Sequence, residues 1–490
     1  MQASWIHEGG KLLETEVLVL PMWEGEKKSS WFDDPHVQFA LKSGDFSGKR
    51  NQVLLVYPTE KGQGFCKRVL LLGLGPKEKA ESDLLRNSFA IATKSLCAFG
   101  WAKATFLIPH KLPKEDDDCL AMIEGVFLAN YSFDALKNES LREEKKRLLE
   151  KAVFVGSQAR GKEMVQQTAL IADSVYFARD LINGNADDVH VKTLSKLAKD
   201  LQKDSQAISV TILEGQKLEA LHMGLLLAVG QGAVRGPALV LIEYRGDPRS
   251  QDVTAIIGKG VTYDTGGLNL KPTGSMETMK CDMSGSAATL ATLHAVARLQ
   301  LKRNVIGVLV IAENAIGPKS YKPGDVVKSY SGKTVEIGNT DAEGRLILAD
   351  ALSYVQEKYR PSRIIDLATL TGGIVIALGE EATGLFSNDD AFAQAISAAG
   401  ERTGERVWRM PLYPEYKELL KSQIADIKNC GPRKASSATA AIFLQEFIHP
   451  DMPWVHLDIA GTAFLAEPKA HQTSNATGVG VRLLIEYLSQ

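Results

Sequence analysis

Short apolar runs alternate with longer amphipathic runs along most of this chain, and this alternation restricts the fold more than any other feature. The apolar runs have the length of buried strands, and the longer runs repeat apolar residues at helical spacing. Strands that alternate with helices form βαβ units around a mostly parallel sheet. In the first part of the chain the predicted strands are 17–20, 53–57, 69–72 and 106–108, and the predicted helices lie near 80–99 and 116–130.

The length of the chain indicates more than one core. A chain of 490 residues exceeds the size of one ordinary core, so two domains are expected. Residues 161–183 have helical spacing, and turn residues follow at 184–188. We therefore predict an α/β fold with a smaller N-terminal α/β domain (1–158), a linker helix (159–185) and a larger C-terminal α/β domain with a mixed central sheet (186–490).

The alternation resumes after residue 190. The predicted strands are 210–213, 238–242, 253–257, 305–311 and 364–365, and residues 285–299 are predicted to form a helix of small residues suited to close packing on a sheet. Lys259 and Asp264 come directly after the strand at 253–257, within a glycine-rich turn. In open α/β sheets ligands bind beyond the carboxyl ends of the strands, so these two side chains are well placed for a binding site.

Charge and cysteine content argue against several classes of protein. The formal net charge of −2 gives no overall electrostatic reason to bind nucleic acid or an anionic membrane. No uncharged apolar run reaches the roughly 18 residues that a membrane helix needs, and the charged N-terminus is unlike a secretory signal. The five cysteines are scattered and contain no Cys-x-x-Cys pair, which is typical of a reducing compartment. We expect a cytoplasmic protein.

Asp264, Asp282, Asp341 and Glu343 are four acids that can meet at one site. Taken alone, Asp282 reads more simply as a helix cap. Asp341, Glu343 and Arg345 alternate, so an extended backbone would place all three on one face, and a salt-bridged surface loop is the simpler interpretation of that segment alone.

Four carboxylates gathered in a cleft would repel one another strongly without a compensating cation. Two divalent ions would neutralise them; oxygen ligands favour manganese or magnesium, and zinc competes on affinity. Lys259 could add a nitrogen ligand only if it were deprotonated. Two ions roughly 3.5–4 Å apart would share a water and make it a nucleophile near neutral pH.

Residues 258–267 and 339–346 resemble the two hallmark motifs of the leucyl (cytosol) aminopeptidases. The similarity continues through Lys271 and covers essentially residues 170–490, whereas the first 150 residues are similar in fold pattern more than in motif. Further matching segments are 279–283, 321–325, 369–373 and 476–482.

The resemblance assigns a role to each of the candidate ligands. It implies that Lys259, Asp264, Asp282 and Glu343 bind one divalent ion, Mn²⁺ or Zn²⁺, and that Asp264, Asp341 and Glu343 bind a second. Asp264 and Glu343 would bridge the pair. The substrate's free α-amine would bind a metal, which would restrict the reaction to the N-terminal residue of a peptide.

The resemblance also implies catalytic and assembly properties. Lys271 would stabilise the gem-diolate, and Arg345 would hold a bicarbonate that acts as general base. The pocket for the first side chain, with leucine preferred, would be lined by Met279, Thr369, Leu370 and Gly372. Peptide substrates and a homohexamer are further implications.

Two segments, 183–188 and 431–437, depart from the family pattern and leave local loop shape and substrate preference open. Two other functions also stay open from the residues. Some family members combine peptidase activity with a DNA-binding or architectural role, against which the near-neutral charge argues. The second open function is a two-metal phosphoesterase, because Lys271 and Arg345 could hold a phosphoryl group.

Overall fold

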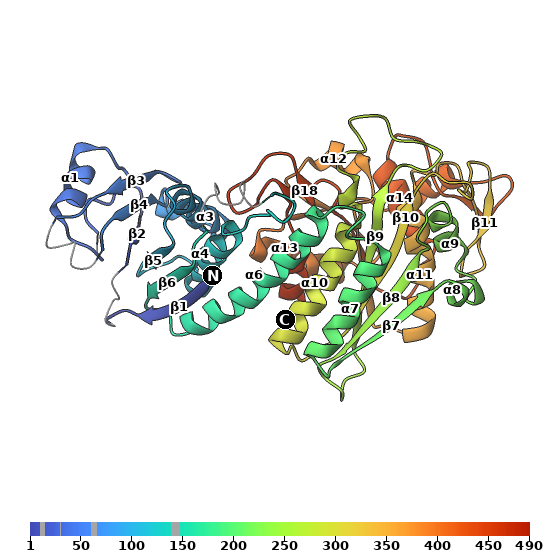
Figure 1. Ribbon diagram of the computed structural model, residues 1–490, viewed down its shortest axis with the longest axis horizontal. Helices are drawn as coiled ribbons and strands as arrows, with labels where there is room; N and C mark the ends of the chain where they lie inside the picture. The colour runs from blue at the N-terminus through green and yellow to red at the C-terminus, as the bar shows by residue number, and fades with distance from the viewer. Residues whose placement is uncertain (10–14, 30, 60–65, 139–147) are drawn as a thin grey trace. The chain divides into compact units, whose positions relative to one another are not determined.

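Two large sheets, one in each half of the chain, organise the structure (Figure 1). The computed structural model describes residues 1–9, 15–29, 31–59, 66–138 and 148–490. One compact unit, here the N-terminal unit, consists of Met1–Asp173 and Glu467–Ser474. The other, the C-terminal unit, consists of Ser174–Ala466 and Asn475–Gln490.

The N-terminal unit contains a six-stranded sheet in the order β1-β6-β5-β2-β4-β3. All neighbouring strands in it are parallel except β3 and β4, which confirms the predicted mostly parallel sheet. The strands are β1 (Gln2–His7), β2 (Val17–Met22), β3 (Val53–Val56), β4 (Val69–Gly73), β5 (Lys103–Leu107) and β6 (Lys151–Gly156).

The helices α1 (Pro35–Ser43), α3 (Ser82–Ala98) and α4 (Glu115–Ala129) accompany this sheet. Asp34 caps α1 by accepting from the His36 amide at 2.9 Å. The first turn of α4 is entirely acidic, which suits the positive end of the helix dipole. The segments predicted as helices near 80–99 and 116–130 are α3 and α4.

The segment predicted as a long helix at 161–183 is α6 (Gly161–Asn183). The division between the two units falls inside this helix, between Asp173 and Ser174. None of the helices in the described part of the chain combines the length and the apolar character that crossing a bilayer requires.

The C-terminal unit contains an eight-stranded mixed sheet in the order β15-β14-β17-β13-β9-β10-β8-β7. The centre of the sheet is parallel, whereas β14 runs antiparallel to β17 and β8 antiparallel to both of its neighbours. The strands are β7 (Ile208–Glu214), β8 (Ala238–Arg245), β9 (Val253–Asp264), β10 (Asn304–Asn314), β13 (Arg363–Ala368), β14 (Thr383–Ser387), β15 (Val407–Arg409) and β17 (Trp454–Asp458).

The predicted mixed sheet is confirmed, but β14, β15 and β17 were not among the predicted strands. In β17, His456 and Asp458 interrupt the apolar run, although both are buried. The helices of this unit are α7 (Val191–Asp204), α8 (Gln216–Ala220), α9 (Gly224–Gly230), α10 (Ser284–Leu299), α11 (Glu343–Tyr359), α12 (Gly372–Leu378), α13 (Asp390–Thr403), α14 (Ser436–Gln445) and α15 (Val481–Leu488).

Helix α10 packs on the sheet at unusually short range because glycines meet at the contact. A Cβ at Gly258 in β9 would lie 2.3 Å from the Gly285 carbonyl oxygen. A Cβ at Gly285 would in turn lie 2.1 Å from the Leu367 carbonyl oxygen in β13. Any side chain at either glycine would separate α10 from the sheet, so the two glycines hold the start of α10 against the carboxyl ends of β9 and β13.

Candidate metal centre

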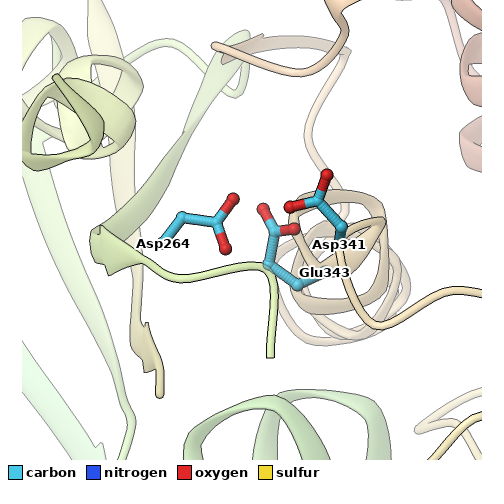
Figure 2. Close-up of side chains that lie close together, drawn as sticks. All are labelled: Asp264, Asp341 and Glu343. Carbon is cyan, nitrogen blue, oxygen red and sulfur yellow. The ribbon is translucent and has the colours of Figure 1, made fainter. Parts of the chain in front are cut away.

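Three carboxylates converge where β9 ends and α11 begins (Figure 2). One oxygen from each of Asp264, Asp341 and Glu343 lies within 4.8 Å of the other two. Asp264 and Glu343 are buried, and Asp341 is half-buried. Asp264 is the last residue of β9, so the site lies at the carboxyl end of a central strand, where the sequence predicted it.

The backbone around Asp341 and Glu343 differs from the extended conformation considered above. Helix α11 begins at Glu343, so alternation does not apply to this segment and the one-face argument was wrong. The two acids converge because Asp341 lies in the turn directly before the helix. Glu343 occupies the first helical turn, where the helix dipole favours a negative charge.

A threonine fixes this turn against the loop that follows β9. The Thr340 hydroxyl donates to the Gly266 carbonyl at 2.6 Å and accepts from the Asn269 amide at 2.8 Å. The Thr340 amide donates to Asn269 Oδ1 at 2.8 Å. These bonds join the two motifs that carry the acids, although the motifs lie far apart in the sequence.

Lys259 and Asp282 extend the cluster on the side of α10. Lys259 Nζ lies 2.8 Å from Asp282 Oδ1, 2.8 Å from Glu343 Oε1 and 2.9 Å from the Thr369 carbonyl oxygen. A Cβ on Gly344 would lie 2.6 Å from Lys259 Cε, so any side chain there would push Lys259 away from its present contacts. Burial opposes the charge of Lys259, but the surrounding carboxylates outweigh burial and raise its pKa. Lys259 is therefore a counter-ion here, and metal binding by its nitrogen requires loss of this proton.

Lys271 occupies the opposite side of the cluster. Its Nζ lies 2.9 Å from Asp264 Oδ2 and also contacts Asp341 Oδ1. Burial opposes the positive charge, but Asp264, Glu343 and Asp341 outweigh burial and raise the pKa of Lys271. Both predicted lysines thus lie among the predicted acids.

The cluster has too few positive charges for its carboxylates. Four carboxylates and two ammonium groups give −4 + 2 = −2. Burial raises the pKa of Asp282 well above its ordinary value, and burial together with repulsion from Asp264 raises the pKa of Glu343 and of Asp341. Asp282 Oδ2 is buried and has no hydrogen-bond partner among the described residues. A carboxylate-rich site with a charge deficit and an orphaned oxygen fits divalent metal ions.

Arg345 does not pair with its acidic neighbours among the described residues. Its Nη1 donates to the Asn429 carbonyl oxygen at 2.9 Å, and its Nε is buried without a partner in the described part of the chain. Burial lowers the pKa of the guanidinium, opposed by Cys430 and the nearby carboxylates. The simpler interpretation of the segment as an internally salt-bridged surface loop is therefore wrong, because Arg345 is 7% exposed and contacts a distant segment.

Two buried asparagines support the cluster and were missed in the sequence. Asn314 Nδ2 donates to Asp264 Oδ1 at 2.8 Å and to the Thr340 carbonyl at 3.0 Å. Asn429 accepts from the Gly338 amide at 2.8 Å and donates to the Asn339 carbonyl at 2.7 Å. Asn314 ends β10, so the rule of strand carboxyl ends could have found it, whereas nothing local in the sequence points to Asn429.

The residues predicted to line a substrate pocket lie next to the cluster. The Thr369 hydroxyl donates to Asp282 Oδ1 at 2.7 Å. Met279 begins the short 3₁₀ helix that carries Asp282, and Leu370 is half-buried beside Thr369. Gly372 is the first residue of α12 and is exposed.

An α/β sheet that ends in a carboxylate-rich metal site is the architecture of a metal-dependent enzyme. The chain matches the model of the cytosol aminopeptidase family, catalytic domain, over residues 176–485 and that of the N-terminal domain over residues 19–140. The chain therefore belongs to the cytosol aminopeptidase family, as its motifs predicted, and is an aminopeptidase of this metal-dependent family.

Relatives are similar over nearly their whole length. A "Probable cytosol aminopeptidase" of Protochlamydia amoebophila is 47% identical over 487 residues, which are 98% of this chain and 97% of the relative. A "Probable cytosol aminopeptidase" of Roseiflexus castenholzii is 42% identical over 481 residues, which are 97% of this chain and 96% of the relative.

Solved structures show the same fold. The bottromycin maturation enzyme BotP in complex with Mn superposes with a TM-score of 0.86 at 32% identity, covering 97% of this chain and 99% of that chain. A mutant of tomato leucine aminopeptidase superposes with a TM-score of 0.88 at 30% identity, covering 100% of this chain and 96% of that chain.

Proposed function

We propose that this aminopeptidase uses two metal ions and releases N-terminal residues, leucine preferred, from peptides in the cytoplasm. The observation that carries the proposal is the cluster of the buried Asp264, Asp282 and Glu343 with the half-buried Asp341, whose four carboxylates exceed its two ammonium groups. A charge deficit of two is far more costly in a buried site than on the surface, so divalent cations are the natural complement.

The ligands divide into two sets that share members. Asp264, Asp341 and Glu343 would hold one ion, and Lys259, Asp264, Asp282 and Glu343 the other. Mn²⁺ or Zn²⁺ bound there would supply Lewis acidity and activate water near neutral pH. The oxygen-rich ligand set favours manganese on softness, and the Mn in the BotP structure is consistent with that choice.

Lys271 is the residue that we assign to the substrate carbonyl. Its side chain is 14% exposed and lies at the edge of the cluster, with its ammonium group on Asp264 and Asp341. A fixed positive charge at this position would stabilise the negative charge that develops on the carbonyl oxygen. We expect the contact with Asp341 to be exchanged for the substrate when the metals neutralise the carboxylates.

Arg345 is the residue that we assign to the general base, which it would bind as bicarbonate. A guanidinium cannot accept a proton near neutral pH, but it holds planar anions through paired donors. The buried Nε of Arg345 has no partner among the residues that the structure describes, which supports the assignment because a donor remains beside the cluster. Its Nη1 bond to Asn429 holds the group in place.

Substrate preference would be set next to the ligands. Met279, Thr369, Leu370 and Gly372 would line the pocket for the first side chain, and a glycine at the start of α12 leaves room for a branched aliphatic group. Thr369 would also orient Asp282 through the 2.7 Å hydrogen bond.

A homohexamer is part of the proposal. Val234, Trp408 and Ile424 are exposed on the C-terminal unit, at 101%, 64% and 64% of their full surface, and such residues are candidates for burial between subunits. Light scattering after size-exclusion chromatography measures the assembly directly, and a monomer at working concentration would contradict it.

One preparation tests the catalytic proposal. Elemental analysis should find divalent metal, and a chelator should abolish hydrolysis of leucyl-arylamide until Mn²⁺ or Zn²⁺ is returned. A panel of aminoacyl-arylamides should rank leucine first. Chelator-insensitive turnover would contradict the metal site, and equal rates on phosphoesters would favour a two-metal phosphoesterase.

A further inference from the structure

A cavity of about 570 Å³ lies between α12 and the start of α14. Its lining includes Gly372 and Gly373 of α12, Ser436 and Ser437 of α14, and apolar side chains such as Ile376, Met410 and Tyr416. Arg433 also lines it, and no acidic side chain does so within the described part of the chain. The loop 431–437, which supplies part of this lining, is one of the two segments that depart from the family pattern.

The cavity lies a short distance along the chain from a residue that contacts the candidate metal centre. A Cβ on Gly373 would lie 2.2 Å from Ser436 Oγ, so the loop packs directly on the start of α12. Thr369, whose hydroxyl donates to Asp282 Oδ1, precedes Gly373 by only four residues. Four residues span at most about 14 Å, which is also the reach of about four residues of an extended peptide.

The cavity presents hydrogen-bond donors and positive charge without an anion. Helix α14 is ten residues long, and its N-cap is Ala435, in the left-handed conformation with φ +55°, which offers no side-chain cap. The first amides of a helix have no partner within the helix, and the dipole there attracts anions.

Side chains of the same loop add to this character. Ser437 is 7% exposed, and its hydroxyl has no hydrogen-bond partner among the described residues. Arg433 and Lys434 are exposed and form no ion pair within the described ranges. The unpartnered Ser437 hydroxyl, the first amides of α14 and the Arg433 guanidinium around one cavity are suited to a carboxylate, and Lys434 adds positive charge in the same loop.

We propose that this cavity is a subsite for a carboxylate that the peptide carries two to four residues after its N-terminus. The inference rests on the proposed peptidase function. The carboxylate can be the C-terminus of a short peptide or an acidic side chain of a longer one, because both present the same group.

Matched peptides test both sources of the carboxylate. kcat/KM is measured for Leu-Gly-Gly against its C-terminal amide, and for Leu-Gly-Glu-Gly-amide against Leu-Gly-Gln-Gly-amide. We expect the charged member of at least one pair to be favoured by about five- to tenfold, mainly through KM, as for a charge-assisted hydrogen bond. The first pair reports the terminus and the second the side chain.

Variants locate the effect. Arg433→Gln combined with Lys434→Gln should lower the preference to about twofold or less, and Arg433→Glu should favour the glutamine peptide over the glutamate peptide in the second pair. Arg249→Gln, which changes an exposed arginine after β8, is the matched control and should keep the wild-type preference.

The outcomes separate the two proposals. Wild-type enzyme that hydrolyses leucyl-arylamide but treats both members of each pair alike would overturn the subsite and leave the peptidase function intact. A preference that survives the double variant would overturn the assignment to this loop. An enzyme that hydrolyses neither the arylamide nor the peptides would overturn the proposed function and the subsite with it.

Discussion

The two units each contain a buried cluster of charges, and the clusters differ in how well they are balanced. In the N-terminal unit, Arg86 is 1% exposed and joins α3 to α4. Its Nε donates to Glu124 at 2.8 Å, and its Nη1 donates to Asp83 at 2.7 Å. Burial opposes the guanidinium charge, but the two carboxylates outweigh burial and raise the pKa of Arg86.

The metal centre of the C-terminal unit has no such balance. Its carboxylates leave a charge of −2 after Lys259 and Lys271 are counted, and Asp282 keeps a buried oxygen without a partner among the described residues. Around Arg86 the corresponding sum is +1 − 2 = −1, and the Asp83 side chain is 18% exposed to water. The cluster around Arg86 joins two helices, whereas the cluster around Lys259 and Lys271 would be completed by the proposed divalent cations.

The largest effect is expected at Glu343, which would be shared by both metals. Glu343→Gln keeps the shape but removes one bridging charge, so leucyl-arylamide turnover should fall by more than about 10³-fold, beyond the scale of one lost electrostatic contact. Glu357→Gln, an exposed position on the same helix, is the control and should keep full activity. Steady-state kinetics with metal content measured in parallel checks both, and near-wild-type turnover of Glu343→Gln would remove Glu343 from the site.

A substitution at Arg86 should lower stability and leave activity unchanged. Arg86→Met leaves Glu124 buried without its partner, so the free energy of unfolding should fall by about 3–5 kcal/mol. Denaturant titration measures the loss, and the double variant Arg86→Met with Glu124→Leu should recover most of it. Folded Arg86→Met should keep the wild-type kcat/KM, because the cluster lies outside the metal centre. A stability loss below about 1 kcal/mol would show that this pair is not a structural tie.

The sequence located most of the fold because continuous apolar runs carry the central strands. It failed at β17, where His456 and Asp458 stand in place of apolar residues. Hydrogen-bond partners in other segments make their burial possible, Asp366 for the histidine and Thr371 for the aspartate. A buried polar residue in a strand carries no local sign of the group that will satisfy it. Periodicity therefore finds strands that face only apolar neighbours.

The same limit applies to the metal centre. The acids could be named in advance because carboxylates that gather must be compensated, and their chemistry is visible in the residue type. Asn429 could not, because its side-chain amide bonds to backbone groups 87 to 91 residues away in the sequence. Nor could alternation show that a helix begins at Glu343. Two acids separated by one residue have the same spacing in an extended segment as in a turn that leads into a helix.

A smaller effect should appear when charge is removed from the unbalanced cluster. Asp282→Asn keeps a hydrogen-bonding oxygen for Lys259 and Thr369 but removes a buried charge, so chelator-treated protein should gain about 1 kcal/mol in unfolding free energy. Metal-stimulated turnover should fall at the same time. Thermal unfolding in chelator measures the first effect, and a loss of stability would show that Asp282 is already balanced without metal, as Glu124 is.

The pair of His456 and Asp366 should have the smallest effect, a dependence of stability on pH. His456 is fully buried, and its Nδ1 lies 2.6 Å from Asp366 Oδ1. Burial and Arg345 oppose the imidazolium charge. The carboxylates of Asp366 and Asp458 outweigh them and raise the pKa of His456 above its ordinary value of 6.5.

A folded-state pKa above the unfolded one means that this stabilisation is fully present below about pH 6.5 and is lost as the pH rises through the raised value. The free energy of unfolding should therefore fall on the order of 1 kcal/mol across that window, and His456→Gln should flatten this part of the profile. Chemical denaturation at a series of pH values in chelator checks it. A wild-type profile that is flat or rises there would show that His456 is neutral in the folded protein, and the pair would then be a hydrogen bond between a neutral ring and a carboxylate.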